Sequence, residues 1–348
     1  MLLLKNIPQK YLNIFYVFAS VLLYNSVPLY KYFKMGQFTS NYILYQYKFT
    51  YQNCGYIKRG LFPSFLELLN LNNQYTYFVI FNLILIIYTF IVVQIANKYL
   101  QENINSYILS FLFLFFGVPH FTLDIYRIDI LIQLITLFIL LLLKNEKYLV
   151  AFLLSLLSIL IHETSLFLII PIFLLIINDR KKWYFSFYLT IFFLMSLLLS
   201  HKLSQNEAII ILKENNSASI EYSQYAAFTL GFKDTILMYF RMYNVGFFII
   251  YGFCYFIILY LSFKKLFTGK FTDYKWLFLF PLLLCFVAVD FLRWYCFVYF
   301  LAMLYALYYN VFSRKSFYYI LFISIILGIP LAIDNKFGII HIVFYLLK

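Results

Sequence analysis

Residues 148–178, YLVAFLLSLLSILIHETSLFLIIPIFLLIIN, decide the fold of this chain. This stretch of 31 residues is almost entirely apolar on either side of His162, Glu163 and Thr164, which interrupt it near its middle. A single helix of this length would measure about 46 Å, well beyond the roughly 30 Å hydrocarbon core of a bilayer. The stretch is therefore either one over-long helix or two short helices that meet at the polar triplet.

The composition of the whole chain excludes a water-soluble domain. Of the 348 residues, 64% are hydrophobic, 24% are aromatic and only 12% are charged, whereas a soluble domain carries roughly 25% charged residues. A disordered chain is excluded as well, because such chains are poor in aromatic residues and rich in charge. The sequence predicts an integral membrane protein.

Apolar runs of membrane-spanning length recur along the chain. Together with two helices in 148–178 they predict an all-α polytopic membrane protein with about 10–12 transmembrane helices, folded as a single domain over residues 1–348. The final segment, 338–347, is too short for a firm assignment. The other predicted spans are 11–30, 75–97, 106–118, 127–143, 184–200, 237–263, 276–289, 294–312 and 317–333.

The positive residues indicate how the helices are oriented. The chain has a net charge of +13, and its lysines and arginines cluster in short segments between apolar runs, as the positive-inside rule describes. This pattern favours membrane topology over nucleic-acid binding. A cytoplasmic N-terminus places most of these clusters inside only if 148–178 is a hairpin whose tip points outward, so we favour the hairpin.

The outer face then carries two long segments. Residues 31–74 form a first periplasmic loop, whose part 61–70 predicts a short helix in the membrane interface. Residues 201–236 form a larger periplasmic loop, which is either a partly ordered lid or a simple connector. Most acidic residues also fall on this side, so we expect any chemistry there. The four cysteines are scattered, and we infer neither a metal site nor a disulfide from them.

Two groups of ionisable residues lie at the outer ends of predicted spans. Asp124, Arg127 and Asp129 open the span 127–143. Arg127 there is suited to hold a phosphate or carboxylate, with the aspartates orienting it; the alternative is a capping aspartate and an interfacial ion pair. His162 and Glu163 form the hairpin tip and are suited to abstract a proton from a hydroxyl. The alternative there is a polar turn, with Thr164 and Ser165 capping the second helix.

Further outer-face cations extend this set. Lys58 and Arg59 precede Gly60, a pattern suited either to an anion site or to a plain loop turn. Arg241 begins the span 237–263. The last group has Asp290 and Arg293 as a helical ion pair beside Trp294, which predicts either a structural pair or a binding element in which the tryptophan stacks on a sugar or joins an interfacial belt.

Several cations on the outer face suit an anionic, lipid-linked substrate. They would neutralise the charge that develops on a phosphate leaving group, and a nearby base would deprotonate the attacking hydroxyl. No metal, cofactor or energy-coupling motif is required, because a lipid pyrophosphate is already an activated leaving group.

The run from Arg127 to Ile177 resembles the bacterial O-antigen and exopolysaccharide polymerases, the Wzy and EpsG-like group. Their loose pattern is an arginine opening an apolar span, a short charged turn, and a span ending in a histidine followed by hydroxyl residues. Here it reads Arg127, then Lys144 to Lys147, then His162 with Thr164 and Ser165. The sequence departs from the pattern at Ile128, where glutamine is frequent, and at Glu163, which is inserted after the histidine.

The resemblance implies polymerisation of undecaprenyl-pyrophosphate-linked oligosaccharide repeats on the periplasmic face of the inner membrane. It implies Arg127 as a substrate-phosphate contact and His162 as a site residue, to which the residue analysis adds Glu163. The implied partners are the lipid-linked oligosaccharide, the bilayer and a regulator of chain length.

Other functions fit parts of the sequence. A GT-C-type transferase using a polyprenyl-phosphate sugar usually places a catalytic acid in its first outer loop, but 31–74 contains only Glu67. A lipid-linked-sugar flippase would carry polar residues through the middle of several spans. A membrane acyltransferase is the remaining alternative, because His162 alone does not exclude it.

Overall fold

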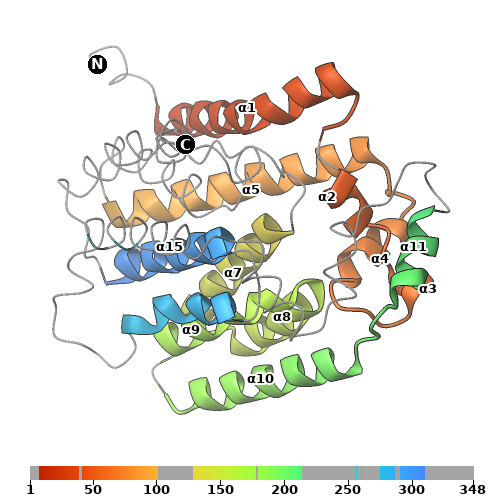
Figure 1. Ribbon diagram of the computed structural model, residues 1–348. Helices are drawn as coiled ribbons and strands as arrows, with labels where there is room; N and C mark the ends of the chain where they lie inside the picture. Colours follow the sequence, from red (N-terminus) through yellow and green to blue (C-terminus); the bar gives the residue numbers. More distant parts are fainter. Residues whose placement is uncertain are drawn as a thin grey trace, which may run out of the picture.

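The computed structural model describes residues 8–38, 41–100, 128–177, 179–213, 256, 260, 275–286 and 291–309. Within these ranges the chain is all-helical (Figure 1). The first half contains α1 (Gln9–Met35), α2 (Asn41–Gln46), α3 (Tyr51–Cys54), α4 (Leu61–Leu68), α5 (Gln74–Leu100) and α7 (Asp129–Lys144). The second half contains α8 (Tyr148–Ile161), η2 (Glu163–Ser165), α9 (Leu166–Ile176), α10 (Lys181–Leu199), α11 (Gln205–Lys213), η4 (Lys275–Phe286) and α15 (Phe291–Tyr308).

Residues 148–178 form a hairpin. Phe152 in the first turns of α8 and Phe173 near the end of α9 both contact the ring of Phe185 in α10, with centroid separations of 5.3 and 5.7 Å. The ammonium of Lys181, just beyond α9, lies 5.8 Å from the ring of Tyr148 at the start of α8. One continuous helix would separate these ends by about 40 Å, so the preference for two short helices is confirmed.

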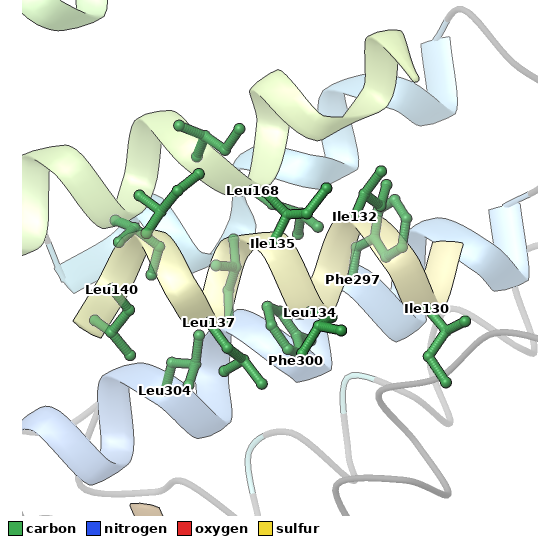
Figure 2. Close-up of a cluster of buried hydrophobic side chains, with 14 of the residues drawn as sticks. Ile130, Ile132, Leu134, Ile135, Leu137, Leu140, Leu168, Phe297, Phe300 and Leu304 are labelled. Atoms are coloured by element: carbon green, nitrogen blue, oxygen red, sulfur yellow. The ribbon is translucent and has the colours of Figure 1, made fainter. Parts of the chain in front are cut away.

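The core is centred on α7. Most of its isoleucine and leucine side chains are buried, and so are its polar residues Asp129, Gln133 and Thr136, because neighbouring helices cover α7 on almost every side. Figure 2 shows them between Leu168 of α9 and three side chains of α15, Phe297, Phe300 and Leu304. The hydroxyl of Tyr305 in α15 donates to the carbonyl of Pro171 in α9 at 2.9 Å, which fixes these two helices to each other.

Helix ends gather at two opposite ends of the bundle. At one end, Lys144 at the end of α7 lies 5.7 Å from the ring of Tyr308 at the end of α15, and Lys181 lies against Tyr148. At the other end, α2, α3, α4 and α11 gather together (right in Figure 1). We call this second end, which also carries the hairpin tip, the polar end. Segments 31–71, 162–165 and 200–213 therefore share one end, as the predicted topology requires.

A second, smaller apolar cluster lies at the polar end. It joins Tyr45, Phe49 and Ile57 of the first loop to Leu203 and Leu212 of the segment after α10. The amide of His201 donates to the carbonyl of Tyr56 at 2.6 Å, and the hydroxyls of Tyr56 and Ser196 lie 2.6 Å apart. The first part of the predicted 201–236 loop therefore docks on the 31–74 loop. The helix predicted within 61–70 is confirmed as α4.

Four helices present apolar side chains to the outside. Large apolar residues are exposed on α1, α5, α8 and α10, and along α10 only Ser186 and Leu189 are buried. Among the described residues, two helices are both long and apolar enough to cross a membrane, at Gln74–Asn97 and Lys181–Leu199. The apolar stretches at Lys10–Leu22, Tyr148–Ile161, Glu163–Ile176 and Cys296–Tyr308 are shorter. Three predicted spans, 106–118, 237–263 and 317–333, and the unassigned terminal segment 338–347 lie largely or wholly outside the described residues.

Polar side chains within the bundle connect several helices. The amide of Asn25 in α1 donates to the side-chain oxygen of Asn82 in α5 at 2.5 Å, and the hydroxyl of Tyr88 in α5 donates to Gln133 in α7 at 3.1 Å. Such pairs hold apolar helices together where packing alone is unspecific.

Candidate site at the polar end

The cations of the first loop are presented by a tight turn. The amide of Gly60 donates to the carbonyl of Ile57 at 3.1 Å, so Lys58 and Arg59 occupy the two central positions. Arg59 has a φ of 65°, a left-handed conformation that glycine or asparagine usually supplies. A non-glycine residue in this conformation persists only where its surroundings enforce it, and such residues gather at functional sites.

Surrounding contacts hold this turn in place. Ile57 is buried in the smaller apolar cluster. The hydroxyl of Ser64 accepts from the amide of Tyr51 at 2.7 Å and donates to the carbonyl of Gly60 at 2.6 Å. A Cβ at Gly60 would lie 2.5 Å from the ring of Tyr51. The turn is therefore packed too closely for Lys58 and Arg59 to move independently of α3 and α4.

The hairpin tip is organised by His162. Its backbone is extended, with φ −159° and ψ 123°, and ends α8. The Nδ1 atom of His162 accepts from the amide of Thr164 at 3.2 Å and lies 2.8 Å from the Thr164 hydroxyl. The imidazole thus caps η2. The alternative interpretation of the tip had Thr164 and Ser165 capping the second helix, α9, and it is wrong at Ser165, which makes no side-chain cap to α9.

The cap fixes the chemistry available to His162. A backbone amide can only donate, so Nδ1 must be an acceptor and the proton of the neutral ring is on Nε2. In this tautomer Nε2 is a donor rather than a base. His162 is 2% exposed, so the ring orientation is fixed by burial as well as by the cap.

The turn and the tip are joined by one ion pair. The Nε atom of Arg59 donates to both carboxylate oxygens of Glu163, at 2.9 and 3.0 Å, and its Nη2 donates to Oε1 at 2.5 Å. The two side chains are only 16% and 17% exposed. The second carboxylate oxygen of Glu163 also lies 3.4 Å from Nδ1 of His162. Two groups that the sequence analysis treated separately therefore form one site.

Lys58 is a second cation beside the Arg59–Glu163 ion pair, and the pair does not neutralise it. Burial lowers the pKa of Lys58, and the positive charges of Arg59 and Lys202 lower it further, while Glu163 opposes the shift. No carboxylate of the described ranges lies within ion-pair distance of its ammonium. Among the described residues, one carboxylate, Glu163, acts on Lys58 against two cations, Arg59 and Lys202, so positive charge is in excess around this turn.

The remaining predicted site residues are distributed as follows. Asp129 is 1% exposed at the first turn of α7. Arg293 lies in the first turn of α15, on the backbone that the structure describes. Arg127, Asp124, Arg241 and Asp290 lie outside the described residues.

Trp294 corrects one expectation. We predicted an interfacial or sugar-stacking tryptophan, but the side chain is 1% exposed and belongs to the main core, 5.7 Å from the ring of Phe297. Residues 296–307 of α15 are buried as well, so Trp294 belongs to the buried part of this helix rather than to its surface.

This arrangement can hold an anion and donate hydrogen bonds to it. Glu163, held by a guanidinium, is a weak base, and His162 offers a proton rather than an acceptor. Within the described ranges, no three His, Cys, Asp or Glu side chains gather into a group able to hold a metal ion.

Sequence reasoning missed the Arg59–Glu163 contact and the capping role of His162. The pair joins residues 104 positions apart, and no local pattern encodes such a contact. A signal for it existed in the cost of an isolated Glu163 between two apolar helices, which demands a cation from elsewhere in the chain.

Comparison of the chain with protein-family models, with curated proteins and with solved structures found no match in any of the three.

Proposed function

We propose that this protein is a membrane-embedded polymerase that joins undecaprenyl-pyrophosphate-linked oligosaccharide repeats into O-antigen or capsular polysaccharide. The polar end faces the periplasm in this proposal, and the reaction transfers a growing glycan from its lipid pyrophosphate to a hydroxyl of the next repeat. The exposed apolar faces of α1, α5, α8 and α10 contact lipid.

The observation that carries the proposal is the convergence of Lys58, Arg59, His162 and Glu163 at one end of an otherwise apolar bundle. Ionisable groups are costly in such surroundings and are retained for function. Their excess of positive charge favours an anionic substrate, and a pyrophosphate leaving group gains stabilisation from cations as its charge develops.

We assign the residue roles as follows. Arg127 and Asp129 contact the substrate, with Asp124, Arg241, Asp290 and Arg293 as further members of the set. His162 is assigned as a hydrogen-bond donor through Nε2, and Glu163 fixes Arg59. A base role for His162 would require the opposite tautomer and the loss of its cap on η2.

The test uses a deletion strain that still makes the glycan precursor. Its extracted lipopolysaccharide or capsule is separated on a gel, with wild type or with variants His162→Ala, Arg127→Ala and Lys181→Ala restored. We expect a single-repeat product in the deletion, a ladder with wild type and with the distant Lys181→Ala control, and no ladder with the first two variants at normal membrane levels. A ladder in the deletion strain itself would refute the polymerase.

One observation favours a second function, a lipid-linked-sugar flippase. The pairs Asn25–Asn82 and Tyr88–Gln133 place hydrogen-bonded polar side chains inside three apolar helices, as expected of a transport path. The same experiment separates the two functions, because loss of a flippase leaves complete precursors on the cytoplasmic side and removes all surface glycan. A first repeat lacking one sugar would instead indicate a GT-C-type transferase.

A further inference from the structure

We propose that the ammonium of Lys58 is the contact for a phosphate group of the substrate, and that Arg59 is a positioning residue that holds Lys58 in place through Glu163. The assignment of this phosphate to a polyprenyl lipid rests on the proposed function, whereas the anion site itself does not.

The first support is the division of charge between neighbouring cations. Arg59 directs Nε and Nη2 to Glu163, which neutralises both partners. Lys58 lies beside this pair, partly buried, and no carboxylate of the described residues is within ion-pair distance of it. A partly buried cation without a counter-ion is destabilising by itself, and a bound dianion removes that cost.

The second support is the conformation of the turn. Arg59 adopts φ 65°, where a glycine would be unstrained, yet the position carries the residue that reaches Glu163. The strain therefore serves to direct the side chains of two consecutive residues. One of them, Arg59, anchors the turn to the hairpin tip, and the other, Lys58, remains available to a ligand.

The third support concerns depth and selects the source of the phosphate. The α8 helix has 14 residues, so it rises about 21 Å from its start near Lys181, roughly 9 Å less than a bilayer core. If the cations at the Lys144 end lie at the inner headgroups, the tip and Lys58 lie within the outer leaflet. A phosphate carried by a lipid reaches that level laterally, while a soluble phosphate must leave water.

The experiment measures binding to the full-length chain in nanodiscs by isothermal titration calorimetry. The probes are undecaprenyl pyrophosphate, undecaprenol and inorganic pyrophosphate, and the variants are Lys58→Gln and Lys202→Gln. Lys202 is a matched control, because it is exposed and contributes to the same field. We expect Lys58→Gln to weaken undecaprenyl pyrophosphate binding by about 10- to 100-fold, as for a lost charged hydrogen bond, and Lys202→Gln by less than about 2-fold.

Comparison of the three probes identifies the ligand. Tight binding of undecaprenyl pyrophosphate, weak binding of undecaprenol and weak binding of inorganic pyrophosphate support a lipid phosphate at Lys58. Equal Lys58-dependent binding of inorganic pyrophosphate supports the anion site but overturns the lipid as its source. Equal losses in Lys58→Gln and Lys202→Gln, or no loss in either, overturn the site.

The positioning role of Arg59 is tested by exchanging the charges. Arg59→Glu and Glu163→Arg each place like charges together and should weaken binding by about 10-fold or more. The double variant restores the ion pair, so it should recover affinity to within about 3-fold of wild type. Failure to recover in a folded double variant would make Arg59 a direct contact and overturn its positioning role.

These results are independent of polymerisation. Lys58-dependent binding together with a normal ladder in the deletion strain would refute the polymerase and leave the phosphate site standing. Loss of the ladder in the deletion, with binding unaffected by Lys58→Gln, would support the polymerase and refute the phosphate site at Lys58.

Discussion

The charged side chains at the polar end differ in their expected effect on the stability of the fold. The Arg59–Glu163 pair satisfies two buried charges with one another, and His162 satisfies a backbone amide. Lys58 has no carboxylate of the described residues within ion-pair distance, and Glu163 only partly offsets the lowering of its pKa. Sites for charged ligands often retain groups that weaken the empty protein, so substitutions at these positions should change stability in different directions.

We expect Lys58→Met to stabilise the ligand-free protein by about 0.5–2 kcal/mol. The folded state lowers the pKa of Lys58 from 10.5, through burial first and then neighbouring cations. A lowered pKa for a base means that folding disfavours the ammonium, so the penalty is full below the folded pKa and fades as pH rises towards 10.5. Thermal unfolding in detergent across pH 7–10.5 measures it. A destabilised Lys58→Met protein at pH 7 would contradict this reading.

We expect Arg59→Met and Glu163→Gln to be destabilising, each by about 1–3 kcal/mol, because each removes the ion pair that neutralises a partly buried charge. The double variant should cost less than the sum of the two, with a coupling energy of about 1 kcal/mol or more. Unfolding of the four proteins in a double-mutant cycle gives this number. Strict additivity would mean that the ion pair contributes nothing to folding.

The sequence predicts the positions of several helices well, but it does not predict the contacts between distant segments. Apolar length alone located α5, α7 and α10 to within a few residues, because such runs have few stable alternatives to a helix. The polar triplet located the hairpin, because two charged or polar residues have no place in a single buried helix. The tip's partner, the buried Trp294 and the cluster around Tyr45 could not be predicted, because they depend on tertiary contacts between distant segments.

The hairpin has a direct test at the level of elements. Reporters fused after Asn145 and after Asp179 should be active on the same side of the membrane, because α8 and α9 lead away from one end and return to it. A reporter after Ser204 should be active on the opposite side. Alkaline phosphatase and a fluorescent protein give complementary readouts. Opposite signals at Asn145 and Asp179 would mean that 148–178 crosses once.

The turn before α4 is tested by Gly60→Ala. The added Cβ would lie 2.5 Å from a ring carbon of Tyr51 and 2.8 Å from a methyl of Ile57, so neighbouring groups must shift at a cost of about 1–3 kcal/mol. Adding Tyr51→Leu removes the ring and should recover part of the loss. Thermal unfolding measures both proteins, and an unchanged Gly60→Ala protein would show that the turn is looser than its contacts indicate.

For the whole molecule, the exposed apolar faces define the surroundings of the bundle. Several helices present large apolar side chains outward, whereas a soluble protein rarely exposes contiguous apolar patches of this extent. In the proposed function a lipid environment resolves this conflict, and the polar end with its small cluster is proposed to lie at the outer interface.

Substitution of two exposed isoleucines tests whether α10 faces lipid or water. Ile191 is near the middle of α10, and Ile210 is on α11 at the polar end. In a bilayer, Ile191→Arg should cost about 2.5–3.5 kcal/mol and lower the membrane level of the protein, while Ile210→Arg should change stability by less than about 0.5 kcal/mol. Immunoblots of membrane fractions and unfolding assays measure the pair. Equal, small effects would mean that α10 faces water.

The ion pair between Arg59 and Glu163 also has a consequence in time. Synthesis proceeds at about 5–20 residues per second, so Arg59 leaves the ribosome roughly 5–20 s before a partner 104 residues downstream exists. In the proposed topology the first loop is exported and waits, with Arg59 not yet paired to Glu163, until the hairpin arrives. A chaperone or anionic headgroup that shields the arginine during this interval would raise the yield of correctly assembled protein.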